Sequence, residues 1–277
     1  MTKASDHGAR APEGAALSLL AAQLVDPPDN VYGARKRLEW ILQRLDPNDR
    51  ILDFGCGTGL GLTIPLLLRG FDVHGVDAHG PSVEAAHRTL RQLGLDETRI
   101  ALSIQGPYSV VIASEVLEHI PDAALDEVVA NVLQRLLPGG RLLITVPNGF
   151  GWFEIESALW FRTPMGRIVE RWRIPGVFRR LKQPFASLSD SPANTLADAE
   201  SPHVQRFTPR RIRRLLRRHG VNTVSIEGLT LVAGPFSNMI FGGIRPLMAA
   251  NQWLGSRLTP LASGYLVEAR ADVSRET

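Results

Sequence analysis

The chain has 277 residues, of which 44% are hydrophobic, so it can bury a sizeable core as one large domain with insertions or an appendage. Its single cysteine, Cys56, excludes an internal disulfide framework and indicates a reducing compartment. The net charge is only +3, and no cysteine–histidine cluster has the spacing of a zinc site. Every long apolar stretch is interrupted by charges or helix breakers, so we expect no membrane span and a cytoplasmic protein.

Residues 1–49 are expected to form an N-terminal helical cap. The apolar run at 15–25 follows a basic segment, as in a secretion signal, but Asp6 and Glu13 interrupt that segment. A short amphipathic helix is therefore the better interpretation. Tyr32, on an expected N-terminal helix, is a candidate for closing over a bound cofactor.

Between residues 50 and 148, short β-like runs alternate with helix-like segments, which is typical of a parallel sheet with helices on both faces. Strands are expected at 50–54, 72–77, 99–105, 108–114 and 141–146. Helices are expected at 81–93 and 121–137, ended by Gly94 and by Pro138-Gly139-Gly140. Pro65 falls where the first helix should lie, so we expect that helix to start late or to kink.

Residues 149–205 are rich in aromatic side chains and predict an insert that could act as a lid, with a mobile polar loop at 183–202. Residues 206–277 are expected to complete the main fold. Thr208 and Gly220 are the expected N-cap and stop of a helix over 209–219. The last two strands are expected at 222–231 and 264–271.

Three glycines, Gly55, Gly57 and Gly59, follow the first strand and precede a helix. Glycine is needed where the backbone turns tightly and approaches a ligand without an intervening Cβ atom. The nicotinamide fingerprint G-x-G-x-x-G fails here, because Leu60 occupies its last position. Asp53, just before the turn, can accept a hydrogen bond from an ammonium group. Asp77, after the second strand, can accept both hydroxyls of a ribose.

Four motifs follow one another at a familiar spacing. They are Ile51-Leu52-Asp53-Phe54-Gly55-Cys56-Gly57-Thr58-Gly59, Gly75-Val76-Asp77, Ala113-Ser114-Glu115-Val116-Leu117-Glu118-His119-Ile120-Pro121 and Leu137-Pro138-Gly139-Gly140-Arg141-Leu142-Leu143-Ile144-Thr145-Val146-Pro147-Asn148. In these motifs the chain resembles class I S-adenosylmethionine-dependent methyltransferases, of the group that includes the ubiquinone-biosynthesis O-methyltransferases. The resemblance implies an α/β, Rossmann-like seven-stranded sheet with a helical insert after strand five, and S-adenosylmethionine as methyl donor.

The resemblance also implies which residues bind the cofactor. Asp53 and the glycine loop would hold its methionine part, Asp77 its ribose, and residues 114–115 its inner side. The predicted cofactor-binding residues are Asp53, Gly55, Cys56, Gly57, Thr58, Gly59, Asp77, Ala78, Ser114 and Glu115. The family often has an acidic residue after the third strand that touches the adenine. Here the short link Gln105-Gly106-Pro107 replaces it, so the mode of adenine recognition stays open.

The candidate catalytic residues are His119 and His203. Methyl transfer is a direct displacement at a sulfonium methyl group, so the protein positions the acceptor and takes its proton. A histidine suits that role because its titration near neutrality matches the working pH.

A divalent metal is an alternative to a histidine base. Glu115, Glu118 and His119 are spaced to share one face of a helical turn. With His203 they resemble a Glu-x-x-Glu-His set that binds a divalent metal in some O-methyltransferases, including small-RNA 2′-O-methyltransferases. We expect the metal-free version, because the same residues begin a helix in many metal-free relatives.

The predicted activity is O-methylation of a small acceptor, lipid-like or phenolic. RNA 2′-O-methylation and non-enzymatic binding of S-adenosylmethionine are the alternatives. No RNA-binding module accompanies the domain, so nucleic acid is not an expected partner. A run of arginines after residue 205 is either a solvated helix face or a contact with an anionic membrane or substrate. The residues proposed for that contact are Arg210, Arg211, Arg214 and Arg218.

Overall fold

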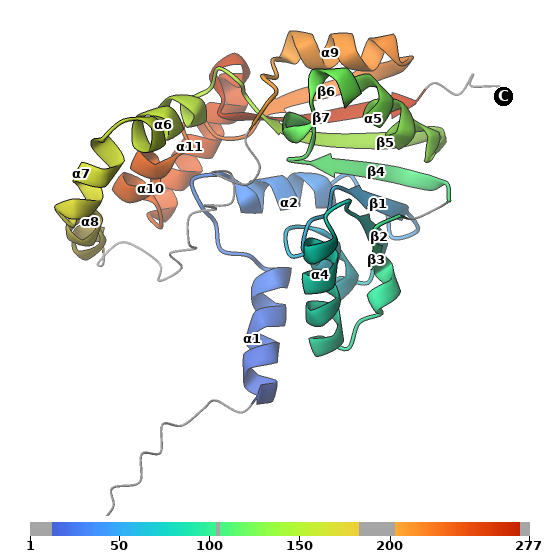
Figure 1. Cartoon of the computed structure of the whole chain (residues 1–277), viewed down its shortest axis with the longest axis horizontal. Coiled ribbons are helices and arrows are strands. Elements are labelled where there is room, and N and C mark those ends of the chain that lie inside the picture. The colour runs from blue at the N-terminus through green and yellow to red at the C-terminus, as the bar shows by residue number, and fades with distance from the viewer. Residues whose placement is uncertain (1–12, 104–105, 183–202, 272–277) are drawn as a thin grey trace, which may run out of the picture.

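A seven-stranded mixed sheet forms the centre of the molecule (Figure 1). The computed structural model describes residues 13–103, 106–182 and 203–271, so the loop expected at 183–202 lies outside the described residues. The strands are β1 (Arg50–Phe54), β2 (Asp72–Val76), β3 (Ile100–Ala101), β4 (Tyr108–Ser114), β5 (Leu136–Pro147), β6 (Val221–Gly228) and β7 (Gly264–Ala271). Their order is β3-β2-β1-β4-β5-β7-β6. Only β7 runs antiparallel to its neighbours, and the predicted seven-stranded Rossmann-like sheet is confirmed.

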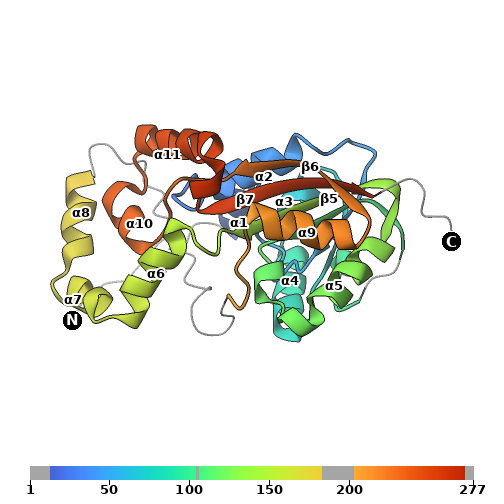
Figure 2. The same cartoon turned by 90° about the horizontal axis from the view of Figure 1, so that it is seen from above.

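Helices cover both faces of this sheet, as predicted. They are α2 (Ala34–Leu42), α3 (Thr63–Leu68), α4 (Gly80–Gln92), α5 (Asp122–Gln134) and α9 (Pro209–Arg218). On β4, Val110 and Ile112 pack with side chains of α2 and α3 on one face. Val111 and Ala113 point the other way and pack with α5 and α9 (Figure 2). Because both faces are buried, the strand is apolar at successive positions, as expected for a parallel strand.

The link from β1 to β2 passes through the glycine turn and the short helix α3. This helix begins at Thr63, which places Pro65 in its first turn, where a missing N–H breaks no bond inside the helix. The expected late start is therefore confirmed. A Cβ atom at Gly59 would lie 2.5 Å from Cδ1 of Ile100, and the φ angle of Gly59 is +73°, so the turn requires glycine there.

The insert after β5 consists of α6 (Trp152–Arg162), α7 (Met165–Arg171) and α8 (Ile174–Lys182). In Figure 1 it lies at one end of the sheet, beside α10 (Pro235–Phe241) and α11 (Arg245–Arg257). Polar contacts join the two groups of helices. The backbone N–H of Ser237 donates to Glu156 over 2.8 Å, and Nζ of Lys182 donates to the carbonyl of Gly242 over 2.8 Å.

Helices α10 and α11 were not predicted, because prolines and charges interrupt the apolar stretch between the last two predicted strands. Pro235 and Pro246, which argue against a membrane-spanning helix, lie in the first turns of these two helices, where proline is tolerated. Among the described residues, no helix is both long and apolar enough to cross a membrane. The helix expected at 15–25 is present as α1 (Glu13–Val25), and its Leu24 packs near α3 and α4.

Three predicted boundaries are wrong. Strand β3 covers only Ile100–Ala101 instead of 99–105, because it lies at the edge of the sheet and pairs only with β2. Helix α5 ends at Gln134, and Pro138-Gly139-Gly140 falls inside the span of β5. In this part of β5 the pairing register with β4 shifts between Tyr108 and Val110. The extra residues of β5 form an irregularity in the strand pair. Strand β6 ends at Gly228 rather than at residue 231.

The first prediction concerns the close approach of α11 to the segment that follows β6. A Cβ atom at Gly255 would lie 2.5 Å from the backbone carbonyl carbon of Thr230. Gly255→Ala should therefore push the helix outward and lower the free energy of unfolding by about 1–3 kcal/mol. Gly176→Ala is the control, because a Cβ atom there meets nothing within 4 Å. Thermal unfolding followed by circular dichroism should separate the two variants, and equal midpoints would contradict the close contact.

Candidate active site

A hollow of about 170 Å³ opens between α2 and the glycine turn, at the carboxyl ends of β1 and β4. Ligands of open α/β sheets bind at this edge. Four predicted cofactor-binding residues are among those that line it: Asp53, Gly55, Cys56 and Ser114. Burial raises the pKa of the Cys56 thiol, which disfavours the thiolate form that a nucleophile needs.

The glycine turn leaves room on the side where a ligand would lie. Gly55 and Gly57 have φ angles of +74° and +55°. A Cβ atom at Gly55 would lie 2.3 Å from Cγ2 of Val116, whereas one at Gly57 meets nothing within 4 Å. Gly55 is thus required by packing, and Gly57 borders open space. Thr58 is half-buried and Gly59 is buried beneath the turn.

Asp53 is a buried carboxyl group at the base of the hollow. Its side chain is 3% exposed, and Oγ1 of Thr63 donates to its Oδ2 over 2.6 Å. Burial raises the pKa of Asp53 to about 6, although the hydrogen bond from Thr63 opposes the shift. Its charged form is therefore poorly compensated, and a cationic group in the hollow would stabilise it.

Asp77 ties the glycine turn to the end of β2. Its Oδ2 accepts from the backbone N–H of Gly57 over 2.7 Å, and its Oδ1 accepts from that of His79 over 2.8 Å. Each carboxylate oxygen can accept more than one hydrogen bond, so Asp77 can also bind the hydroxyls of a ligand. Ala78, the next residue, is exposed.

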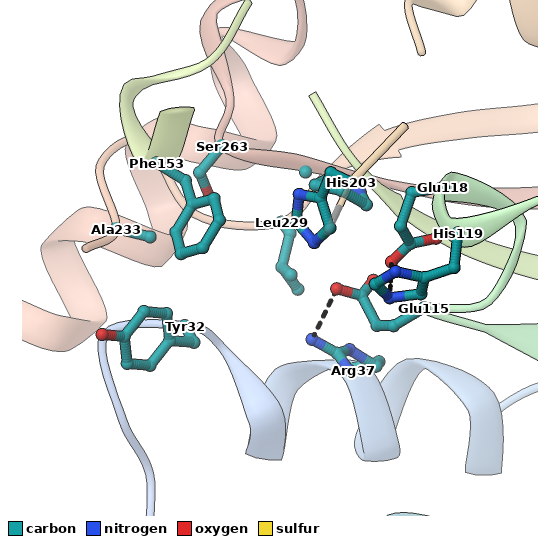
Figure 3. A pocket seen from close by; sticks show the side chains of 12 residues that line it. Tyr32, Arg37, Glu115, Glu118, His119, Phe153, His203, Leu229, Ala233 and Ser263 are labelled. Atoms are coloured by element: carbon teal, nitrogen blue, oxygen red, sulfur yellow. Dashed lines mark ion pairs between the residues drawn. The ribbon is translucent and has the colours of Figure 1, made fainter. Parts of the chain in front are cut away.

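A second cavity, of about 250 Å³, is lined by side chains from several segments, among them Phe153 of α6 and His203 (Figure 3). Its apolar wall includes Tyr32, Phe153 and Leu229, and its polar wall includes Glu118, His119 and His203. Arg37 of α2 lines both this cavity and the hollow at the glycine turn, so the two spaces are neighbours. Tyr32 thus borders the second cavity rather than the glycine turn.

Glu118 lies in the short 3-10 turn η2 (Leu117–His119), with its side chain 1% exposed. Within the described part of the chain, neither of its carboxylate oxygens has a hydrogen-bond partner. Burial, and after it the charge of Glu115, raise the pKa of Glu118 well above its usual range. Such a carboxyl group either holds a proton or needs a nearby cation.

The returning chain brings His203 to the same place. The backbone N–H groups of Val204 and Gln205 donate to the carbonyl of Glu118 over 2.9 and 3.0 Å. The rings of His119 and His203 lie with their centroids 5.2 Å apart, and both line the second cavity. The structure therefore brings the two predicted catalytic histidines together. One potential ligand atom from each of Glu118, His119 and His203 falls within 4.8 Å of the others.

Glu115 does not join this cluster, and the expectation that it shares a helical face with Glu118 and His119 is wrong. The 3-10 turn begins only at Leu117, and Glu115 precedes it with a φ angle of 55°. The carboxylate of Glu115 accepts from Oγ1 of Thr145 over 2.9 Å and lies 3.6 Å from the guanidinium of Arg37. Glu115 therefore borders the second cavity beside Arg37 instead of completing a four-residue ligand set.

Arg37 and Glu154 were missed by the sequence analysis. Arg37 ends a run of three basic residues that is followed by mostly apolar ones, a composition found in ordinary surface helices, and no motif marks it. In the structure its Nε atom is buried without a hydrogen-bond partner among the described residues. Oε1 of Glu154, in the insert, lies 3.0 Å from Nδ1 of His203.

Comparison with known proteins connects this geometry to a family. A family model described as "Methyltransferase domain" matches residues 30–226. The ubiquinone biosynthesis O-methyltransferase of Rickettsia prowazekii (strain Madrid E) is 33% identical over 123 residues, which cover 40% of this chain and 48% of that protein. The chain thus spans about half the length of the curated relative it matches.

Two solved structures share the fold. The Burkholderia thailandensis 1,6-didemethyltoxoflavin-N1-methyltransferase, solved with 1,6-didemethyltoxoflavin and S-adenosylhomocysteine, has a TM-score of 0.50 and 17% identity, covering 98% of this chain and 92% of that one. The [4+2]-cyclase SpnF also has a TM-score of 0.50, with 16% identity, covering 87% of this chain and 81% of that one. At these identities the likeness concerns the fold alone, because one fold supports different reactions.

The family match covers more than half of the chain and includes the glycine turn, Asp77, η2 and β5. It agrees with the resemblance predicted from the four motifs and with the strand order of the sheet. The chain belongs to the family of methyltransferase domains.

Proposed function

We propose that this chain transfers the methyl group of S-adenosylmethionine to a hydroxyl group of a small acceptor. The observation that supports it is the pair His119 and His203 in a cavity that adjoins the hollow at the glycine turn. The acceptor oxygen attacks the methyl carbon, the bond from that carbon to sulfur breaks, and S-adenosylhomocysteine leaves as a neutral thioether. A histidine takes the proton of the hydroxyl group.

The residues around the glycine turn fit this cofactor. The buried carboxyl group of Asp53 would pair with the ammonium group of the methionine part, which supplies the missing positive charge. Arg37, between the two cavities, would bind the carboxylate of the same part. Asp77 would accept the ribose hydroxyls, and the open space beside Gly57 lets the ligand approach the backbone. Cys56, Thr58, Ala78 and Ser114 would complete the walls.

The second cavity favours a small, ring-shaped or lipid-like acceptor. Its volume of about 250 Å³ is at the low end for ligand pockets, and it holds one ring system rather than a nucleic-acid strand. The ring of Tyr32 meets that of Phe153 edge to face, with centroids 6.2 Å apart. A phenolic ring can pack on this aromatic wall with its hydroxyl group toward the histidines. These features favour a phenolic acceptor over RNA.

The metal-assisted alternative has one observation in its favour: the buried oxygens of Glu118 accept no hydrogen bond from the described residues. Glu118, His119 and His203 could hold a divalent cation, which would acidify the acceptor hydroxyl. However, Glu115 is engaged by Arg37 and Thr145, so the set that the motif suggests is incomplete. We therefore propose a histidine base without a metal, and a proton on Glu118.

Segments on either side of the core contribute to the proposed acceptor site beside residues of the core itself. We propose that 50–148 is the cofactor-binding core and that 1–49 is a cap, which contributes Tyr32 and Arg37. The insert at 149–205 contributes Phe153 and His203 and would act as a lid over the acceptor. The part from 206 to 277 adds the last helices and strands of the sheet.

The arginines of α9 divide into two groups. Thr208 caps the helix as predicted, by accepting from the N–H of Arg211. Arg211 and Arg218 pair with Asp122 and Asp126, over 2.6 and 3.2 Å. Arg210 and Arg214 are both exposed on this basic helix. Of the four arginines proposed for an anionic membrane or substrate, these two are the better placed for a peripheral contact.

The second prediction follows from the raised pKa of Asp53. Below pH 6 its carboxyl group is protonated in the free protein and cannot form an ion pair with the ligand ammonium. Affinity for S-adenosylhomocysteine should therefore rise with pH through about 6, by up to about tenfold per pH unit, and then level off. Calorimetric titration across this range measures it. In Asp53→Asn the affinity should be low throughout, and an unchanged rise in that variant would contradict the assignment.

The third prediction concerns Asp77. Asp77→Ala removes a charged acceptor from the ribose hydroxyls and should weaken S-adenosylhomocysteine binding by about 1.5–3 kcal/mol. Asp72→Ala is the control, since Asp72 lies at the other end of β2 and pairs with Arg99. Calorimetry should show normal affinity in the control. Normal affinity in a folded Asp77→Ala protein would remove Asp77 from the cofactor site.

The fourth prediction separates the base from the metal. Turnover of labelled S-adenosylmethionine with phenol and catechol acceptors should survive treatment with a chelator. It should fall by about 10²–10⁴-fold when the histidine that acts as base, His119 or His203, is replaced by alanine. His219→Ala is the control, because His219, which directly follows α9, contacts Asp126 of α5 outside the cavity. Loss of turnover with chelator, restored by a divalent ion, would establish the metal-assisted version instead.

A further inference from the structure

The insert contributes a carboxylate that no sequence motif marks. Glu154 is the third residue of α6, and its Oε1 lies 3.0 Å from Nδ1 of His203. We propose that Glu154 is a positioning residue, which fixes the tautomer and the ring orientation of His203. This inference rests on the proposed role of His203 as a base and extends it to the insert.

The tautomer follows from the chemistry of the contact. A neutral imidazole has one N–H donor and one lone-pair nitrogen, and an ionised carboxylate can only accept. Nδ1 of His203 therefore donates to Glu154, and the lone pair is on Nε2. A free histidine side chain in water favours the opposite arrangement, with the proton on Nε2. Without Glu154, the nitrogen that should receive the acceptor's proton would more often carry one already.

The ring of His203 is also confined by its neighbours. Its side chain is 15% exposed, and its centroid lies 5.2 Å from that of His119 and 5.7 Å from that of Phe153. Phe153 and Glu154 are consecutive residues, so the same turn of α6 supplies both the packing contact and the hydrogen bond. Packing limits the plane of the ring, and the hydrogen bond selects which edge of the ring faces Glu154.

The first turn of α6 is held independently of His203. The carboxylate of Glu156 is 3% exposed and accepts from the backbone N–H of Ser237 over 2.8 Å, which joins α6 to α10. At the other side, the N–H of Gly149 donates to the carbonyl of Phe207 over 3.0 Å. Glu154 is therefore placed by the fold, as a positioning residue must be.

The charges around His203 are consistent with this role. Glu154 faces it from α6, while Glu118 and His119 belong to η2. When His203 accepts a proton it becomes cationic, and the carboxylate of Glu154 stabilises that charge on the side away from the acceptor. Arg37 lies on the opposite wall and pairs with Glu115, not with Glu154.

A spectroscopic experiment tests the tautomer directly. Long-range ¹H–¹⁵N correlation spectra of the full ¹⁵N-labelled chain, at mildly alkaline pH, distinguish the two neutral tautomers of each histidine. His203→Asn identifies the signals of His203. We expect the Nδ1–H form in the unmodified protein and a shift toward the Nε2–H form in Glu154→Ala. In Glu154→Gln the amide N–H can donate to Nδ1, so this variant should also favour the Nε2–H form.

The matched control is Glu170→Gln, which removes a charge from an exposed position of α7 in the same insert. It should leave the signals of His203 unchanged. An Nε2–H form in the unmodified protein, or an unchanged tautomer in Glu154→Ala, would overturn the proposal.

A second measurement distinguishes a positioning role of Glu154 from a role in folding. It also tests the role of Glu154 separately from the proposed function. Glu154→Ala should bind S-adenosylhomocysteine with normal affinity while turnover falls by about 10–100-fold. Neither the spectra nor the binding assay requires the acceptor. If the unmodified chain did not bind S-adenosylhomocysteine, the proposed function would fail while the tautomer result stood. Normal binding and normal turnover in Glu154→Ala would overturn the role of Glu154 alone.

Discussion

The backbone pairing between Asn148 and Phe207 is the contact on which the proposed acceptor site depends. The chain leaves β5 at this point to make the insert, and it returns here before α9. Gly149 allows the two segments to touch, because a Cβ atom there would lie 2.4 Å from Cα of Arg206. The buried amide of Asn148 adds a third segment by donating to the carbonyl of Ala262 over 2.8 Å. Phe153 and Glu154 follow Asn148 closely in the chain, and His203 precedes Phe207. The junction therefore brings these three residues close to η2.

Two buried carboxyl groups give the paired cavities their electrostatic character. Asp53 lies at the glycine turn and Glu118 in η2, and burial raises the pKa of both. Arg37 lines both spaces. Its positive charge offsets only part of the cost of burying these two carboxylates, because its guanidinium pairs with Glu115. A ligand that carries an ammonium and a sulfonium group brings positive charge to a site that lacks it. Binding of such a ligand would therefore offset the cost of burying the two carboxyl groups.

Local patterns were sufficient to predict the sheet. The glycine turn, Asp53 and Asp77 recur at fixed places relative to strands, and the late start of α3 follows from the geometry of Pro65. The meeting of His119 with His203 was suggested by the resemblance to a Glu-x-x-Glu-His set with a downstream histidine, and the hydrogen bonds to the carbonyl of Glu118 produce it. The positions of Glu115, Arg37 and Glu154 could not be predicted in this way. They depend on contacts between segments far apart in the chain. The strand and helix periodicities of 2 and 3.6 residues contain no information about such contacts.

The walls of the second cavity come from separate parts of the chain and include none of the three glycines of the turn. Tyr32 precedes α2, Phe153 begins the insert, and Leu229 follows β6. A substitution at any of these positions changes the shape of the cavity without altering the loop proposed to bind the methyl donor. Over evolutionary time, a lineage with this architecture can acquire new acceptors through a few side chains while its donor chemistry is inherited unchanged.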